Sequence, residues 1–274
     1  MNLKKVLTVA GSDSGAGAGI QADLKTFSAM GVYGLNVLTA VTAQNTASVT
    51  GIHVIPPEFV AKQITALFED MEIAAVKTGM LVNVDIIDAV CEQFIRFKAE
   101  NIVVDPVMIA TSGDHLIDEQ VENFVEAIRN RLLPLAFIVT PNIPEAEILT
   151  GRKITGIVDM KVAAAELQGL GVPNVVIKGG HLNNEDNLVD LLFDGNEFVE
   201  YIGKRVLTQN THGTGCTFAS AVAAGLALGK NIKDVVGDAK RYVSYAMEYS
   251  YSIGRSGGPL NHFAGFGRLG DDGE

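Results

Sequence analysis

The segment Gly213-Thr214-Gly215-Cys216 joins two glycines to a thiol at the start of a long predicted helix of small residues. The first turn of a helix has backbone N–H groups without intrahelical partners and carries about half a positive charge. Glycines at that place let a phosphate approach those N–H groups closely. The segment therefore predicts an anion-binding site, and a buried helix that merely begins with glycine is the alternative.

Cys216 itself stands in the first turn of that helix. A thiol in this position is expected to have its pKa lowered from about 8.5, which predicts a thiolate near neutral pH. Beside an anion site, a thiolate would suit a base or an activating group for a hydroxyl that attacks a phosphoryl group. An inert buried cysteine is the alternative, and it is our interpretation of Cys91, which lies within a helical pattern.

A second glycine-rich segment, Gly11–Gly19, follows the first apolar run of the chain. It lacks the Lys-Ser or Lys-Thr of a P-loop. It fits the dinucleotide pattern G-x-G-x-x-A, but no acidic residue that could hold a ribose occurs between Asp23 and Glu58. We therefore interpret it as a loop whose backbone approaches a small flat ligand. Asp13 and Asp23 would offer carboxylates to that ligand, or Asp13 would cap a helix.

These residues require elements that bring them together. Nearly continuous Val/Ile runs alternate with helical patterns, which is typical of parallel strands joined by right-handed crossovers. We predict strands over 5–11, 35–44, 74–80, 101–108, 136–142 and 174–180, and helices over 19–30, 57–70, 83–99, 118–130, 159–170, 213–228 and 232–252. The result is an α/β fold, with a central, mostly parallel sheet flanked by helices on both faces.

The later part of the chain differs from this alternation. Two strands around Asp194-Gly195 predict a hairpin at a sheet edge. No linker divides the sequence, so we predict one domain over 1–266 and a polar, frayed tail over 267–274. Ligands of such sheets bind outside the carboxyl ends of the strands. Polar and glycine segments follow the predicted strands there: GSDSGAGAG, AQNT, KTGM, DPVMIATSGD, TPNIPE and KGGH. Their convergence predicts one site.

Composition excludes several classes of partner. The net charge of the 274 residues is −11, which argues against nucleic acid and anionic membranes, because both need a basic patch. No apolar run reaches the roughly 18–20 residues of a membrane span, and the N-terminus does not match a signal peptide. Two cysteines form no disulfide framework. We expect a cytoplasmic protein without a nucleic-acid or membrane partner.

The motifs GSDSGAGAGIQADLK, TAQNT, KTGM, DPVM, TPNIPEA, KGGH and HGTGCT follow one another over residues 4–263. In this order they resemble the ribokinase-like vitamin kinases, and most closely the hydroxymethylpyrimidine and phosphomethylpyrimidine kinases of thiamin biosynthesis. The resemblance implies a three-layer, Rossmann-like fold, ATP with Mg²⁺, and a homodimer. It also implies phosphorylation of 4-amino-5-hydroxymethyl-2-methylpyrimidine and then of its monophosphate.

The resemblance also implies roles for single residues. Gln44 would pair with the edge of the pyrimidine ring, because an amide both accepts and donates hydrogen bonds. Asp23 would lie near the polar groups of the substrate, and Met80 and Val107 would pack against its ring. The implied acceptor side consists of Gly11, Asp23, Gln44, Met80 and Val107.

On the nucleotide side, the resemblance makes Gly213, Thr214 and Gly215 the anion hole for the transferring phosphoryl group, with Thr214 also binding ATP. Cys216 stands where related sugar kinases have an aspartate base. Lys178 would contact an ATP phosphate as a point charge. The phosphates and Mg²⁺ would be served by Asp105, Asn142 and Glu145, with Glu145 acting through water. Alternatively, Asp105 merely ends a strand and Glu145 is a first-turn helix carboxylate.

Two other functions remain open at this stage. A cysteine-type pyridoxal kinase shares most of these motifs, although Gln44-Asn45-Thr46 favours the pyrimidine enzymes. A ligand-binding protein that has lost turnover would keep the same fold. Among the histidines, His181 and His212 lie in loops that would border the site, and His115 lies in a segment that would close over it.

Overall fold

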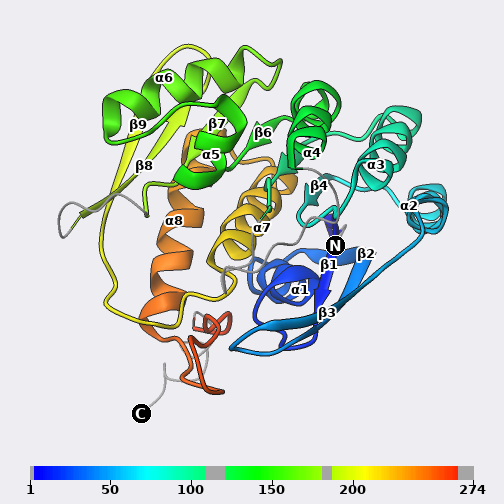
Figure 1. Ribbon diagram of the computed structural model, residues 1–274, viewed down its shortest axis with the longest axis horizontal. Helices are drawn as coiled ribbons and strands as arrows, with labels where there is room; N and C mark the ends of the chain where they lie inside the picture. The colour runs from blue at the N-terminus through cyan, green and yellow to red at the C-terminus, as the bar shows by residue number, and fades with distance from the viewer. Residues whose placement is uncertain (1–2, 109–120, 181–186, 265–274) are drawn as a thin grey trace.

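The computed structural model describes residues 3–108, 121–180 and 187–264, and Figure 1 shows the course of the chain. Within these ranges a nine-stranded sheet has the order β3-β2-β1-β4-β5-β6-β7-β8-β9. His115, His181 and the predicted tail over 267–274 lie outside the described residues.

The sheet is parallel from β2 to β7, which confirms the mostly parallel α/β fold. β8 and β9 form the predicted hairpin at one edge. At the other edge β3 pairs antiparallel with β2 and was not predicted, because most of its side chains are exposed and it has no apolar alternation. The strands are β1 (Lys5–Asp13), β2 (Tyr33–Gln44), β3 (Val49–Val54), β4 (Ala75–Thr78), β5 (Ile102–Val104), β6 (Ile138–Val139), β7 (Asn174–Ile177), β8 (Asn187–Phe193) and β9 (Phe198–Lys204).

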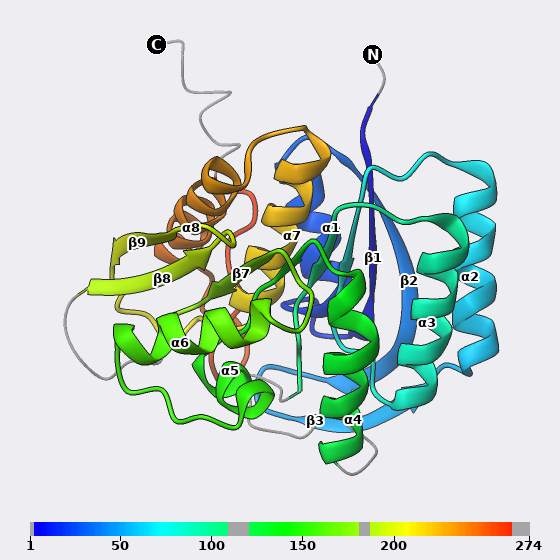
Figure 2. The same ribbon diagram turned by 90° about the horizontal axis from the view of Figure 1, so that it is seen from above.

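Helices cover both faces of this sheet and make three layers. α1, α7 and α8 cover one face, and α2 to α6 cover the other (Figure 2). None of the helices in the described ranges is long and apolar enough to cross a membrane. The helices are α1 (Gly19–Ala29), α2 (Pro57–Asp70), α3 (Val84–Phe97), α4 (Val121–Ala127), α5 (Ile143–Thr150), α6 (Ile157–Gln168), α7 (Thr214–Ala227) and α8 (Ile232–Glu248).

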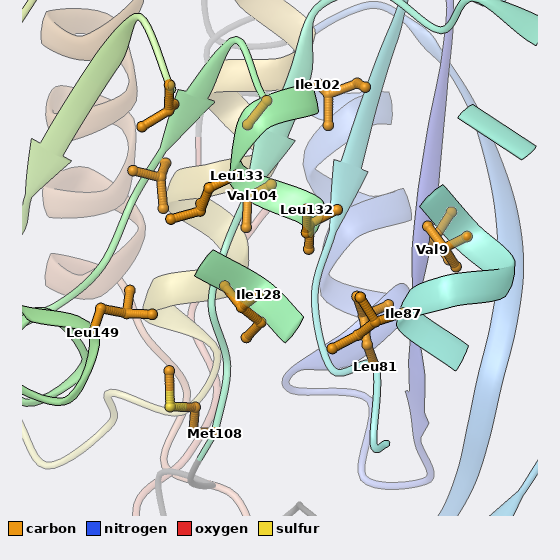
Figure 3. Close-up of a cluster of buried hydrophobic side chains, with 14 of the residues drawn as sticks. Val9, Leu81, Ile87, Ile102, Val104, Met108, Ile128, Leu132, Leu133 and Leu149 are labelled. Carbon is orange, nitrogen blue, oxygen red and sulfur yellow. The ribbon is translucent and has the colours of Figure 1, made fainter. Parts of the chain in front are cut away.

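The core consists of two apolar clusters, one on each side of the sheet. In the larger cluster, sheet residues such as Val9 and Val104 pack against Ile87 of α3 and Ile128 beyond α4, as Figure 3 shows. In the smaller cluster, α7 packs closely because its residues are small. A Cβ at Gly225 would lie 2.9 Å from Cγ2 of Val235, so glycine lets α8 pack directly against α7.

The order of the strands fixes where a ligand can bind. α1 carries the chain from β1 to β2 on one side of β1, whereas α2 returns it to β4 on the other side. Such a reversal leaves a crevice at the carboxyl ends of the two central strands, because their following helices lie on opposite faces. The crevice is expected beyond the ends of β1 and β4.

His262 gives the fold a pH dependence. It is 2% exposed, its Nε2 lies 2.9 Å from Oγ1 of Thr217, and burial lowers its pKa from 6.5 to about 4. The unfolded chain therefore binds more protons between these two values, so stability falls as the pH falls from 6.5 to 4. We expect a loss of about 3 kcal/mol over this interval.

Chemical denaturation at several pH values would measure this loss. His262→Gln should flatten the dependence between pH 4 and 6.5, whereas His53→Gln on exposed strand β3 should leave it as in the parent protein. If the unfolding free energies of the parent and His262→Gln depend on pH in the same way, the pH dependence does not come from His262.

Candidate active site

A cavity of about 580 Å³ lies at the carboxyl end of the parallel strands. Segments that follow β1, β4, β5, β6 and β7 form its walls, and the segment before α7 closes it. Of the site residues predicted from the sequence, the cavity brings together Gly11, Gln44, Met80, Asp105, Val107, Asn142, Glu145, Lys178, Gly213, Thr214, Gly215 and Cys216. It does not bring Asp23 to its wall.

Asp13 organises the first glycine loop. Its carboxylate accepts hydrogen bonds from the backbone N–H groups of Gly15 (2.7 Å), Gly17 (3.0 Å) and Ala18 (2.8 Å). Burial opposes ionisation here, but the hydrogen bonds from His212 and the backbone hold the pKa of Asp13 below its usual value. Asp13 therefore shapes the loop as an anion instead of capping α1, whose N-cap is Ala18.

The two glycine loops lie directly against each other. Nε2 of His212 is 2.8 Å from a carboxylate oxygen of Asp13. A Cβ at Gly213 would lie only 1.9 Å from the carbonyl oxygen of Gly17, and Gly213 has a φ of +86°. Glycine is therefore required at position 213 for two reasons, the close approach and the left-handed backbone.

The start of α7 faces a buried ion pair. A Cβ at Gly215 would lie 3.3 Å from Nζ of Lys178 and 3.7 Å from a carboxylate oxygen of Asp105. Lys178 and Asp105 are themselves 3.1 Å apart. Burial alone would lower the pKa of Lys178, but the charges of Asp105 and Glu145 raise it above its ordinary value. A permanent cation and a helix N-terminus therefore border the same part of the cavity, as anion binding requires.

Asn142 and Glu145 begin α5 as a capping box. Oδ1 of Asn142 accepts from the backbone N–H of Glu145 (2.9 Å), and Glu145 accepts from that of Asn142 (2.8 Å). Glu145 is thus a first-turn helix carboxylate that also lines the cavity. Burial raises its pKa to about 7, assisted by the charge of Asp105 and opposed by Lys178. An added cation would relieve this repulsion between two carboxyl groups.

The acidic residues of the cavity fit a hydrated Mg²⁺ ion. Over residues 3–108, 121–180 and 187–264, no three His, Cys, Asp or Glu side chains form a group that could hold a metal by themselves. Asp105 and Glu145 supply two carboxyl groups beside Lys178. Mg²⁺ commonly takes one or two carboxylates, and water and phosphate oxygens complete its coordination. The donor set therefore fits an ion that arrives with phosphates.

Another part of the cavity suits a flat ring. Met80, Val107 and Met108 give it an apolar surface. A Cβ at Gly11 would lie 2.6 Å from Cε of Met80, so glycine leaves space for this side chain. At the edge of this surface, Oε1 of Gln44 accepts a hydrogen bond of 3.1 Å from Thr42. Its NH₂ group remains a donor with two hydrogens for a ligand.

The structure contradicts the prediction of a lowered pKa for Cys216. Burial raises the pKa of this thiol to about 11, and the charges of Asp23 and Asp105 add to the effect. Lys77 and the backbone N–H of Gly19 lower it, but by less. The partial burial of the thiol and the nearby carboxylates thus outweigh the effect of the N–H groups at the start of α7.

Asp23 lies beneath the floor of the cavity and is fully buried. Its carboxylate accepts two bonds from Nζ of Lys77 (2.9 and 3.0 Å), one from Thr8 (2.6 Å) and one from Ser220 (2.7 Å). These four bonds use the accepting capacity of a carboxylate. Lys77 lines the cavity instead of Asp23, although no role was predicted for this lysine. The motif KTGM, which begins within a buried strand, was the available signal.

A second, more open hollow of about 760 Å³ lies between β9 and α8. It has basic residues, but Lys230 and Arg241 both pair with Asp238. The cavity at the strand ends is therefore the better candidate for chemistry.

A helix N-terminus and a paired lysine share one cavity with an apolar surface and an amide, at the carboxyl ends of a mostly parallel sheet, and this combination is what a phosphotransferase of the ribokinase-like fold requires. The family model described as phosphomethylpyrimidine kinase matches residues 13–261. The chain belongs to this family.

The names of individual relatives are consistent with this family. The thiamine biosynthesis bifunctional protein ThiED of Geobacter sulfurreducens is 52% identical over 257 residues, which are 94% of this chain and 52% of that protein. The chain thus spans about half of that relative. The hydroxymethylpyrimidine/phosphomethylpyrimidine kinase of Bacillus subtilis is 45% identical over 96% of both chains. A pyridoxal kinase from Staphylococcus aureus, solved with AMP-PCP and pyridoxal, has a TM-score of 0.86 at 38% identity and covers 96% and 94% of the two chains.

Proposed function

We propose that the chain uses ATP to phosphorylate 4-amino-5-hydroxymethyl-2-methylpyrimidine and then its monophosphate, giving the diphosphate for thiamine biosynthesis. Its identity to the kinase of Bacillus subtilis over nearly the full length of both chains supports this substrate. The observation that carries the proposal is that one cavity holds both kinds of binding group. Lys178, after β7, and the start of α7 can bind phosphate, whereas Gln44, at the end of β2, and an apolar surface can bind a ring.

ATP occupies the wall with Lys178 in this proposal. AMP-PCP, the nucleotide in the Staphylococcus aureus pyridoxal kinase, is an ATP analogue. The N-terminal turn of α7, with Gly213, Thr214 and Gly215, receives the transferring phosphoryl group, and Lys178 and Asn142 contact the phosphates. Asp105, and Glu145 through water, would hold Mg²⁺, which would offset phosphate charge.

The pyrimidine occupies the apolar surface of the cavity. The amide of Gln44 pairs with the ring edge, and Met80 and Val107 pack against its face, while the backbone at Gly11 lies close to the ring. This pose directs the hydroxymethyl group toward Cys216. The Cys216 thiol first loses its proton to solvent. The hydroxyl oxygen then bonds to the γ-phosphorus of ATP, the bond from that phosphorus to ADP breaks, and the hydroxyl proton passes to the ionised sulfur.

Phosphorylation of pyridoxal is the second candidate. It is favoured by the structural similarity to the pyridoxal kinase of Staphylococcus aureus, with its TM-score of 0.86. Pyridoxal also carries a hydroxymethyl group on an aromatic nitrogen ring, so it presents a similar acceptor to the same wall.

A product assay distinguishes the two candidates. The protein is incubated with ATP, Mg²⁺ and either the hydroxymethylpyrimidine or pyridoxal, and products are followed by mass spectrometry. We expect the pyrimidine monophosphate and then its diphosphate, with slower turnover of pyridoxal. Rapid formation of pyridoxal phosphate beside an unchanged pyrimidine would reject the first candidate and our assignment of Gln44.

We also propose that the chain forms one catalytic domain and acts as a cytoplasmic homodimer, without a nucleic-acid or membrane partner. The net charge of −11 supports the absence of polyanionic partners. Light scattering during size-exclusion chromatography would measure the oligomeric state, and a monomer at assay concentrations would reject the dimer.

A further inference from the structure

Lys77 places a fully buried positive charge at the floor of the cavity. Its side chain comes from β4, is 0% exposed and contributes to the cavity wall. A Cβ at Gly79 would lie 2.8 Å from Nζ of Lys77, so glycine at position 79 leaves room for the ammonium group. Burial opposes its charge, but Asp23 and neighbouring groups raise the pKa of Lys77 above its ordinary value. The ammonium therefore stays charged.

The position of Lys77 is fixed through Asp23. Asp23 of α1 holds the ammonium at 2.9 and 3.0 Å. Thr8 of β1 and Ser220 of α7 hold Asp23 in turn. Ser220 comes four residues after Cys216 on α7, so the two side chains lie on the same face of that helix. Helix α7, which carries Cys216, is thus hydrogen-bonded through Ser220 to the carboxylate of Asp23 that holds Lys77.

The thiol of Cys216 is surrounded by charges of both signs. Asp23 from α1 and Asp105 from beyond β5 act against its ionisation, as burial does. Lys77 from β4 acts in favour, and Lys178 from beyond β7 interacts with the same sulfur. Lys77 and Cys216 both line the cavity, and Asp23 joins Lys77 to Ser220, one turn after the thiol on α7.

We propose that Lys77 is a positioning residue, which Asp23 holds so that its positive charge makes ionisation of the Cys216 thiol less unfavourable. The contribution to turnover rests on the function proposed above. The thiolate forms when the thiol loses its proton to solvent. The sulfur then takes the proton of the acceptor hydroxyl, the hydroxyl oxygen bonds to the γ-phosphorus, and the bond from that phosphorus to ADP breaks. The sulfur returns the proton to solvent in the next cycle.

The proposal predicts shifts of opposite sign for the two partners of the pair. Lys77→Met removes the favourable charge and should raise the pKa of Cys216, whereas Asp23→Asn removes an unfavourable charge and should lower it. The readout is the rate of alkylation by iodoacetamide between pH 8 and 9, without substrates. We expect Lys77→Met to slow alkylation by between about threefold and tenfold, and Asp23→Asn to accelerate it by a similar factor.

The background for these measurements is Cys91→Ser, so that Cys216 reacts alone. Lys230→Met, which removes an exposed lysine beside Asp238, is the matched control and should not change the rate. Circular dichroism and thermal unfolding establish that each variant is folded. If Lys77→Met does not fold, the proposal is tested with Asp23→Asn alone. An alkylation rate in Asp23→Asn that is slower than that of the background protein, or equal to it, would overturn the proposal.

Turnover is measured separately from the thiol. A shift in alkylation without any phosphorylated pyrimidine would leave the role of Lys77 toward Cys216 intact and reject only the proposed function. If alkylation shifts and the pyrimidine is a substrate, Lys77→Met should lower kcat for the hydroxymethyl substrate and change KM little, because Lys77 acts through the sulfur. A change confined to KM would overturn the positioning role.

Discussion

Replacing Cys216 with alanine is expected to slow the first phosphorylation by ~10²–10⁴-fold, the usual contribution of a positioned acid or base. The second phosphorylation should lose less than about tenfold. Its acceptor is a phosphate monoester, whose second pKa is about 6, so the attacking oxygen is already ionised at pH 7.5 and needs no base. One substitution should therefore separate two reactions of the same cavity.

Initial rates measured from each acceptor in turn would provide this comparison. The hydroxymethylpyrimidine reports the first reaction, and its monophosphate, supplied as substrate, reports the second. Cys91→Ala is the control, because this cysteine lies in α3 among core residues, where burial raises its pKa to about 12. Equal losses in the two reactions would mean that Cys216 binds or shapes the site without handling the proton.

Replacing Gly213 with alanine is expected to remove most activity in both reactions, by ~10²–10³-fold, as the loss of an oxyanion-hole donor does. The new Cβ would lie 1.9 Å from the carbonyl oxygen of Gly17, and the backbone φ of +86° is unfavourable for any side chain. The loop must therefore move, and the N–H groups at the start of α7 move with it.

Gly229→Ala supplies the matched control for this prediction. Gly229 follows α7 at its other end, has a φ of +76°, and has no atom within 4 Å of the place where a Cβ would stand. It carries the same kind of backbone strain without a close contact. Its activity should match that of the parent, with a loss of stability of about 1–2 kcal/mol. If Gly213→Ala and Gly229→Ala have comparable activity, the close contact between Gly213 and Gly17 is not what activity requires.

Much of the fold could be predicted because its signals are local. The apolar runs gave the six predicted parallel strands, and the turn at Asp194-Gly195 gave the hairpin. α5 was missed because its short, mostly apolar sequence has no helical periodicity, and its evidence is instead the capping box of Asn142 and Glu145. β3 was missed because it is an edge strand whose side chains are mostly exposed, so it has no apolar alternation.

The sequence predicted which residues line the candidate site, but it did not predict how their charges affect one another. Strand ends and glycine loops identified nearly all the cavity residues, because parallel strands end at one edge. The pKa of Cys216 depends instead on Lys77, Asp23 and Asp105, which are distant in sequence. Asp23 likewise belongs beneath the cavity only because Thr8 and Ser220 meet it there. The pKa of a buried group sums the effects of residues that are far apart in sequence, so it can be obtained only when their positions in space are known.

The contact between the two glycine loops has a consequence for binding thermodynamics. Asp13 and His212 join the loop beside the acceptor wall to the loop that begins α7, and Gly213 leaves no gap between them. A ligand that shifts one loop must shift the other. Nucleotide and acceptor should therefore alter each other's affinity, and thermodynamic linkage requires the two factors to be equal. Calorimetric titration of each ligand, with and without its partner, should give one coupling free energy by either order of addition.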